Sequence, residues 1–209
     1  MAKRPSFSDR ALVLATANRA KARELRALLD GIPYRVLDLT DFPSLPLPAE
    51  GKESYTENAL LKARAVAVAT RMLALADDSG IEVDALGGRP GVLSARYGGE
   101  GLSDEDRCTV MLRELRDVPR ERRTARYRCA VALCRPDGRE VTTEGVVDGV
   151  LVDGPRGSGG FGYDPLFYSP ALGITFAEMT PEAKHAVSHR GQAMASARRI
   201  LLDWSSVGS

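Results

Sequence analysis

The order of apolar and polar residues predicts that the chain opens with a strand, a helix and a second strand. Residues 11–15 form a short apolar run, ALVLA, which is typical of a buried strand. Apolar residues then recur at helical spacing across residues 19–29, and Gly31 supplies a stop. Residues 34–39 predict a second strand, and the proline-rich stretch DFPSLPLPAEGK at 41–52 must be a loop.

The next segment predicts a long helix and then a strand that ends in two carboxylates. Residues 54–57, Ser-Tyr-Thr-Glu, have the form of a capping box, and the helix after it extends to about Arg71. The apolar residues 73–76 predict a strand that delivers the Asp-Asp pair at 77–78 at its end. The Ser-Gly pair at 79–80 is suited to a tight turn.

The second half of the chain adds a hairpin between further helices. A Pro-Asp-Gly turn at 136–138 joins two predicted strands. The mixture of βα units with a hairpin favours an α/β fold with a mixed sheet. The proline-rich loop and the glycine-rich tract at 154–162 are expected to mark a cleft between two lobes. The predicted strands are 124–134 and 140–152, and the predicted helices are 103 to about 115, one starting at Thr180-Pro181, and about 191 to 204.

Composition restricts the class of protein. A length of 209 residues suits one large domain or two closely joined lobes. The charge is balanced, with 29 Lys and Arg against 28 Asp and Glu, so no nucleic-acid polymer is expected as partner, whereas small anionic ligands stay possible. The opening residues MAKRPSFSDR lack an apolar region, and no run of 18 apolar residues occurs, so neither export nor a membrane is expected. Three cysteines, Cys108, Cys129 and Cys134, fit a reduced, cytoplasmic setting, with the last two on opposite faces of the sheet.

The first strand–helix junction carries residues that suit a phosphate group. Thr16, Asn18 and Lys21 offer a hydroxyl, an amide and an ammonium where a helix begins, and free backbone N–H groups and the helix dipole also favour an anion there. The alternative is ordinary capping by Thr16 or Asn18, with Lys21 in solvent. The segment is not a Walker A loop, because its glycines and GK[ST] ending are absent.

The Asp77-Asp78 pair indicates a metal and an activated water. Carboxylates at the end of an apolar strand commonly hold Mg²⁺, and a neighbouring carboxylate can act as a base toward water. The alternative is that one Asp caps the turn that follows. Glu50 is a candidate third carboxylate, although spacing alone does not place it near Asp78. Lys62 is four residues after Asn58, so the two share a helix face that could look into the same cleft; the alternative is a solvated surface lysine.

Two later stretches suit a purine base. In GSGGFGYDP, residues 157–165, glycines allow close backbone approach, Phe161 offers a flat face for stacking and Asp164 offers an acceptor. The alternative, a flexible glycine-rich linker, does not explain why Phe161, Tyr163, Asp164 and Pro165 occur so close together. Further along, His189 and Arg190 can donate hydrogen bonds to a purine edge, with Lys184 one turn earlier; capping by Ser188 explains part of this pattern.

Four long stretches in register resemble the inosine triphosphate pyrophosphatase family, also called the Ham1-like noncanonical purine NTP pyrophosphatases. They are ESYTENALLKARAVA, ADDSGIEVDALGGRPGVLSARYGG, GSGGFGYDPLF and EMTPEAKHAVSHRGQA, and the match extends from Leu12 to about Leu201. The resemblance implies one domain over residues 1–209, elongated and two-lobed, with a long twisted mixed sheet flanked by helices and the active site between the lobes. It also implies that a homodimer hydrolyses ITP, dITP and XTP, with Mg²⁺, to the monophosphate and pyrophosphate, which removes deaminated purines from the nucleotide pool.

Carried over position by position, the resemblance implies three groups of site residues. The metal would be held by Glu50 and Asp78, and Asp78 would also be the catalytic base for the attacking water. The triphosphate would be bound by Thr16, Asn18, Lys21, Lys62 and Ser79. The base would be bound by Phe161, Gly162, Tyr163, Asp164, Lys184, His189 and Arg190.

Three departures from the family pattern and two rival functions remain. The first loop reads TANRAK, where the family usually has a glycine after the threonine. The stretch EGKES replaces a Glu-Thr-Gly arrangement, so the match to the family is weakest at Glu50. His185 stands where asparagine is common. One rival is a Maf-like nucleotide pyrophosphatase with another base preference, against which FGYDP and SHR weigh. The other is a nucleotide-binding regulator without turnover, against which the three carboxylates Glu50, Asp77 and Asp78 weigh.

Overall fold

A computed structural model describes residues 10–51 and 54–206 of the chain. Residues 1–9, 52–53 and 207–209 lie outside the described residues. Two predictions fall partly on them: that the opening residues carry no export signal, and that the proline-rich stretch 41–52 is a loop. No helix of the described part has the length and apolar character needed to cross a membrane. The remaining predictions can be compared with the structure element by element.

The opening strand–helix–strand unit is confirmed. Strand β1 covers Ala11–Leu14, helix α1 covers Arg19–Leu28 and strand β2 covers Arg35–Asp38. β1 and β2 are parallel, with Leu12 opposite Val36. A short 3₁₀ helix, Leu39–Asp41, follows β2, and the proline-rich residues after it form neither helix nor strand. Helix α2, Tyr55–Thr70, also begins where predicted, because the Ser54 side chain accepts a hydrogen bond from the Glu57 N–H.

Strand β3 corrects the prediction of a turn after the two aspartates. It covers Leu73–Val83, so the segment Asp77–Gly80 lies inside a strand of 11 residues. The prediction was wrong because it ended the strand where the apolar residues end. The polar residues that follow continue the strand, since their side chains find partners within the fold. Beyond them, Ile81 and Val83 are again fully buried. The strand therefore carries its carboxylates in its middle, where the backbone is extended and rigid.

The later elements that were predicted agree with the sequence, with one shift, whereas the short strands β6 and β7 were not predicted. The turn of the predicted hairpin is closed by a hydrogen bond from Arg135 N to Arg139 O. The final helix begins at His189, two residues before the predicted start, so that His189 and Arg190 belong to its first turn. The elements are α3 Asp104–Glu114, β4 Thr124–Cys134, β5 Glu140–Leu151, β6 Phe167–Ser169, β7 Ile174–Thr175, α4 Pro181–Val187 and α5 His189–Ser206.

The strands form one mixed sheet, and the chain divides into two compact units. The strand order is β2-β1-β3-β4-β5-β6-β7, with β1 parallel to β3 and the pairs β5–β6 and β6–β7 antiparallel. The first unit consists of the described part of Met1–Asp78 with Ala130–Glu144 and the described part of Gln192–Ser209. The second unit consists of Ser79–Cys129 and Gly145–Gly191. Strands β3, β4 and β5 contribute residues to both units.

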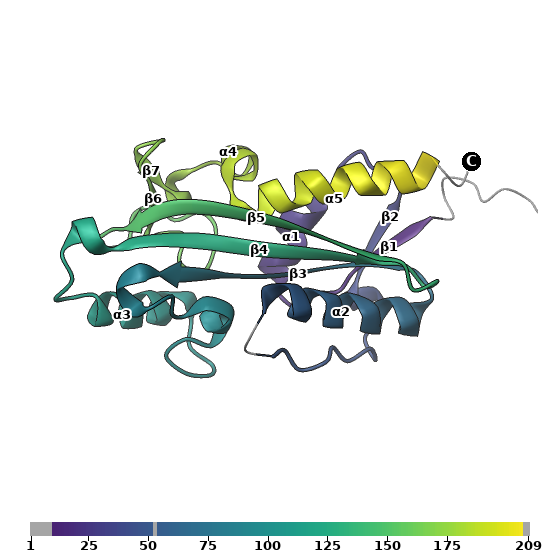
Figure 1. The fold of residues 1–209 in the computed structure, drawn as a ribbon, viewed down its shortest axis with the longest axis horizontal. Coiled ribbons are helices and arrows are strands. Elements are labelled where there is room, and N and C mark those ends of the chain that lie inside the picture. The colour runs from purple at the N-terminus through teal and green to yellow at the C-terminus, as the bar shows by residue number, and fades with distance from the viewer. Residues whose placement is uncertain (1–9, 52–53, 207–209) are drawn as a thin grey trace, which may run out of the picture. The chain divides into compact units, whose positions relative to one another are not determined.

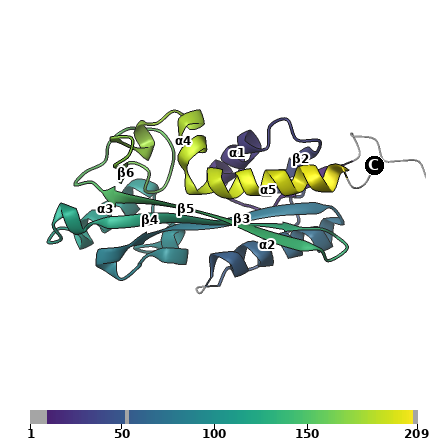
Figure 2. The same cartoon turned by 45° about the horizontal axis from the view of Figure 1, so that its top comes forward.

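The first unit is a sheet covered by helices on both faces. Helix α2 lies on one face, and α1 and α5 lie on the other (Figures 1 and 2). Val13 and Ala15 pack with α2, whereas the alternating residues Leu12 and Leu14, also fully buried, face the other way. Cys134 belongs to the α2 face, and by the same alternation Cys129 faces the opposite side, as predicted. All three cysteines are buried and unpaired by disulfides.

The second unit has its own core, in which aromatic side chains are prominent. Apolar residues from α3, including Met111, pack against the ends of β3 and β4 and against the segments after β5. At the centre, Tyr127 of β4 contacts Phe167 and Phe176, with ring centroids 4.6 and 5.8 Å apart. Burial of such rings supplies much of the apolar area that holds a unit of this size together. This core supports the glycine-rich tract and the start of α5.

Candidate active site

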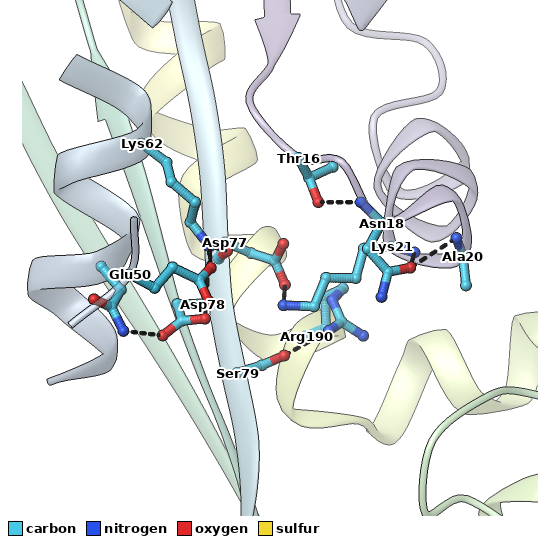
Figure 3. Close-up of polar contacts among 11 residues, drawn as sticks. Thr16, Asn18, Ala20, Lys21, Glu50, Lys62, Asp77, Asp78, Ser79 and Arg190 are labelled. Carbon is cyan, nitrogen blue, oxygen red and sulfur yellow. Dashed lines mark hydrogen bonds and ion pairs between the residues drawn. The ribbon is translucent and has the colours of Figure 1, made fainter. Parts of the chain in front are cut away.

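Asp77 and Asp78 leave β3 on opposite faces, so each has its own partner in the first unit. Asp77 Oδ2 forms an ion pair with Lys21 Nζ at 3.3 Å. Asp78 Oδ2 accepts a hydrogen bond of 2.9 Å from Asn58 Nδ2 of α2. Figure 3 shows the two carboxylates pointing away from each other. Because adjacent residues of a strand face opposite ways, the repulsion expected from the sequence is largely avoided.

Lys62 is the buried cation around which the acidic groups of the first unit gather. Its side chain comes from α2, one turn after Asn58, and only 5% of it is exposed. Its Nζ lies 2.6 Å from Glu50 Oε1 and 3.5 Å from Asp78 Oδ1, and it donates a hydrogen bond of 2.8 Å to the Asp77 carbonyl oxygen. Lys62 is therefore not a solvated surface lysine, which was the alternative that the sequence left open.

Asn58 also holds the loop that carries Glu50. Its Oδ1 accepts a hydrogen bond of 2.7 Å from Gly51 N, and its Nδ2 lies 3.3 Å from Gly51 O as a donor. One buried amide thus joins this loop to Asp78. This contact explains how Glu50 and Asp78, far apart in the sequence, reach the same ammonium group.

The charge states of this cluster follow from burial and from its neighbours. Burial lowers the pKa of Lys62, but Asp78, Asp77 and the hydrogen-bonded Glu50 more than offset this and raise it. Burial raises the pKa of Asp78, opposed by Lys62 and Lys21 and by the hydrogen bond from Asn58. The raised pKa of Lys62 favours its charged form, because three acidic groups act on it. A further cation beside Asp78 would act against the effect of burial on the pKa of that carboxyl.

The first strand–helix junction combines capping with an ion pair. Asn18 is the N-cap of α1, and its Oδ1 accepts hydrogen bonds from the N–H groups of Ala20 and Lys21 at 2.9 and 3.1 Å. Thr16 Oγ1 accepts from Asn18 N at 3.3 Å. Asn18 thus does the capping that the sequence offered as the alternative, Thr16 holds the residue before the helix, and Lys21 is directed at Asp77 rather than left in solvent (Figure 3). The phosphate-binding roles of all three stay predictions.

The donor set of the first unit fits a divalent hard cation. Glu50 and Asp78 supply carboxylate oxygens that meet at a single positive charge, now that of Lys62. Mg²⁺ typically takes one or two carboxylates and completes its shell with waters and substrate phosphates. Among the described residues there is no group of three or more His, Cys, Asp or Glu side chains that could hold a metal. A site here would therefore depend on this pair with water or substrate.

In the second unit, Asp164 is a buried anion held by several donors. Its Oδ2 accepts hydrogen bonds of 2.6 Å from Lys184 Nζ and 2.9 Å from Phe161 N. Its Oδ1 accepts a longer bond of 3.3 Å from Tyr127 OH. The fold at Gly160, with φ of +70°, leaves space for this carboxylate, since a Cβ there would lie 2.0 Å from Asp164 Oδ2. The glycine-rich tract is accordingly built around Asp164 and is not a linker.

The ring of Phe161 lies close to two cationic side chains, Lys184 of α4 and Arg190 at the start of α5. Lys184 Nζ is 5.0 Å and the Arg190 guanidinium carbon is 5.4 Å from its ring centroid. Arg190 is buried and donates a hydrogen bond of 2.8 Å to Ser79 Oγ (Figure 3). Ser188 Oγ accepts from Gly191 N at 3.1 Å, which confirms the expected capping by this residue. The predicted base-binding residues of the second unit thus include a cluster of contacting side chains.

Three further hydrogen bonds of this tract were not predicted. Gly162 N donates a hydrogen bond of 2.7 Å to Asp104 Oδ2, and Gly162 O accepts one of 3.4 Å from Cys108 Sγ, so the first turns of α3 hold the backbone of the tract. The phenol of Tyr163 is buried and donates to Ser94 O at 2.8 Å, so this side chain serves the core and its predicted role would fall to its backbone. Only Asp104 carried a sequence signal, as part of the segment predicted to begin a helix.

Comparison with known proteins identifies the family. Residues 12–200 match the model described as the Ham1 family. The chain belongs to the Ham1 family. The matched range contains every predicted site residue in both units, and its ends lie close to those of the resemblance noted in the sequence.

Individual relatives of this Ham1-family chain are similar over most of its length. A dITP/XTP pyrophosphatase of Geobacter sulfurreducens is 54% identical, covering 88% of this chain and 92% of the relative. One of Thermus thermophilus is 51% identical, covering 92% and 90%. Among solved structures, a HAM1 protein from Coxiella burnetii has a TM-score of 0.84 at 38% identity, covering 93% of this chain and 99% of that one. The mixed sheet with flanking helices is thus the fold of Ham1 proteins.

Proposed function

We propose that this protein hydrolyses deaminated purine nucleoside triphosphates, namely ITP, dITP and XTP, to the monophosphate and pyrophosphate. The observation that carries the proposal is the buried Lys62 ammonium shared by Glu50 and Asp78, in a chain whose relatives are dITP/XTP pyrophosphatases. Such a chain would remove deaminated purines from the nucleotide pool. A regulator without turnover is disfavoured because the carboxylates Glu50, Asp77 and Asp78 are all present.

The phosphate chain of the substrate is assigned to residues of the first unit and to Ser79. Cleavage between the α and β phosphates requires that the charge of the triphosphate be neutralised. Lys21 and Lys62 supply positive charge, and each is already directed at a carboxylate of β3. Thr16 and Asn18 add a hydroxyl and the N-terminus of α1, where backbone N–H groups favour an anion.

Glu50 and Asp78 are assigned to Mg²⁺, which their oxygen donors fit. When bound, the ion would supply charge stabilisation at the phosphate oxygens. Its positive charge would also favour the ionised form of Asp78, whose pKa is raised by burial in its absence. Asp78 in that form takes the proton of the attacking water, and Asn58 holds the carboxylate in place through Oδ2.

The purine base is assigned to the second unit. Hypoxanthine and xanthine carry an oxygen at C6, where adenine carries an amino group. Donors such as His189 and Arg190 can form hydrogen bonds with this oxygen. The amino group of adenine is itself a donor and offers them no acceptor. Phe161 supplies a flat face for the base, and Gly162 and Tyr163 supply backbone groups beside it. Asp164 and Lys184 are also assigned to the base, and their buried ion pair, with Nζ–Oδ2 of 2.6 Å, fixes this tract.

The two groups of residues come from two units that are joined directly in the chain. The peptide bond between Asp78 and Ser79 is one of the points where the chain passes from one unit to the other, so the assigned metal ligand and an assigned phosphate ligand are adjacent in the chain. We assign the protein to the cytoplasm, as its buried thiols favour, and to a homodimer. Sedimentation of the purified protein tests the dimer, since a monomer at micromolar concentration would exclude it.

Product analysis with four nucleotides tests the proposed function. Wild-type protein is incubated with ITP, XTP, GTP or ATP, with and without Mg²⁺, and pyrophosphate and orthophosphate are measured separately. We expect pyrophosphate from ITP and XTP at rates far above those for ATP, and only with Mg²⁺. Equal rates on all four nucleotides would refute the base selectivity, and release of orthophosphate in place of pyrophosphate would refute the site of cleavage.

A further inference from the structure

Tyr127 is a buried side chain of β4 that no sequence motif singles out. It lies in the core of the second unit, and its residue is only 7% exposed. Phe167 and Phe176 pack against its ring, with the Phe176 plane inclined by only 16°. These contacts fix the ring, so the groups that it touches in turn are held in a defined place.

The hydroxyl of Tyr127 is directed at the buried anion of the second unit. It donates the 3.3 Å hydrogen bond to Asp164 Oδ1, on the oxygen opposite to the one that binds Lys184 and Phe161 N. A buried ion pair is favourable only where further hydrogen bonds satisfy its remaining lone pairs. Burial above all, and then the charge of Asp164, raise the pKa of Tyr127 well above its ordinary value, so the phenol keeps its proton and stays a donor.

The ring of Tyr127 also defines the plane of the His189 imidazole. The two centroids are 4.5 Å apart and the planes are inclined by 7°, which is a parallel stack. His189 is only 3% exposed, so its ring has little freedom to leave this stack. Since the N–H bonds of an imidazole lie in its plane, the stack fixes the plane in which His189 can donate.

We propose that Tyr127 is a positioning residue for base recognition, which holds the Asp164 carboxylate and the His189 imidazole in one fixed arrangement. The inference rests on the proposed function, because that function gives His189 and Asp164 their roles at the base. Tyr163 of the same core shows the contrast. Its hydroxyl is bonded to a backbone carbonyl, that of Ser94, whereas the Tyr127 hydroxyl is bonded to an ionised group of the site. Tyr127 thus acts through two other residues and touches no substrate.

Three variants separate this role from a purely structural one. Tyr127→Phe removes only the hydroxyl, and Tyr127→Leu removes the ring and its stack on His189. Tyr168→Phe is the matched control, because Tyr168 packs against the same core but has Arg120, at 5.8 Å, as its charged neighbour instead of a residue assigned to the base. For each protein, kcat and KM are measured with ITP and with ATP, together with the thermal midpoint of unfolding.

Tyr127→Phe is expected to raise KM for ITP by about tenfold, because the Asp164 carboxylate is then held less firmly in place, with kcat and the values for ATP changed less than about twofold. Tyr127→Leu is expected to lose about a hundredfold in the ITP-to-ATP ratio of kcat/KM, and Tyr168→Phe to keep the wild-type ratio. An unchanged ratio in both Tyr127 variants, or an equal loss for ITP and ATP, would overturn the inference. A wild-type protein without preference for ITP would instead overturn the proposed function, so the two failures are distinguishable.

Discussion

Asp77 and Asp78 are adjacent in β3, yet their carboxylates lie on opposite faces of the strand, one beside Lys21 and the other beside Asn58. The extended backbone at this point, and not a turn, separates the two charges. It also gives them different surroundings, since the Asp78 carboxylate meets Glu50 at the Lys62 ammonium, whereas Asp77 contacts that ammonium through its backbone carbonyl oxygen. The assignment of the metal and of the catalytic base to Asp78, and not to Asp77, follows from this geometry.

Replacement of Lys62 is expected to destabilise the protein far more than replacement of an exposed cation on the same helix. Lys62→Met leaves buried acidic groups without their partner, which typically costs about 3–5 kcal/mol of the free energy of unfolding. Arg64→Met is the matched control, because Arg64 pairs with Glu140 but half of its side chain is exposed. Its loss should cost about 1 kcal/mol or less. Denaturant unfolding of both variants measures the difference, and equal losses would contradict the central place given to Lys62.

Gly191→Ala is expected to damage the start of α5. A Cβ at this position would lie 1.8 Å from the carbonyl oxygen of His185, so the helix start must move away from α4. Overpacking of this kind typically costs about 1–3 kcal/mol or more, and the displacement would carry His189 and Arg190 with it. Gly154→Ala is the control, since nothing lies within 4 Å of its added Cβ. The midpoint temperature of unfolding and the ITP-to-ATP ratio of kcat/KM should both fall in Gly191→Ala and stay unchanged in Gly154→Ala. A Gly191→Ala protein with wild-type stability and selectivity would refute this packing.

The buried thiols are expected to be unreactive in the folded protein at pH 8. Burial raises the pKa of Cys108 and of Cys134 from 9.0 to about 11, with Asp104 and Glu140 as the next causes. Only about a thousandth of each thiol is then ionised at pH 8, and the thiolate is the reactive form. Because unfolded thiols ionise first, the stability from these groups is present below pH 9 and is lost between about pH 9 and 11. Thiol labelling should be slow in buffer and rapid in denaturant, whereas rapid labelling of the native protein would contradict the assigned burial.

The sequence predicted most elements, because apolar runs and capping signals act locally. The opening βα unit, the Ser54 cap and the Pro-Asp-Gly hairpin are examples. It failed at β3, where Asp77–Gly80 continue a strand only because Lys21, Asn58 and Lys62 come to them from other elements. The contact of Glu50 with Lys62 and the place of Tyr127 were also beyond reach. Both depend on tertiary packing, which no residue spacing along one chain reveals.

The role of Asp78 is tested most directly by pyrophosphate release from ITP at saturating substrate and Mg²⁺, compared between wild type and Asp78→Asn. The variant keeps an oxygen that can accept from Asn58, so the fold should persist, while the charge and the base are lost. We predict that kcat falls by about a thousandfold, within the range for loss of a general base. An Asp78→Asn protein that releases pyrophosphate at the wild-type rate would contradict the account.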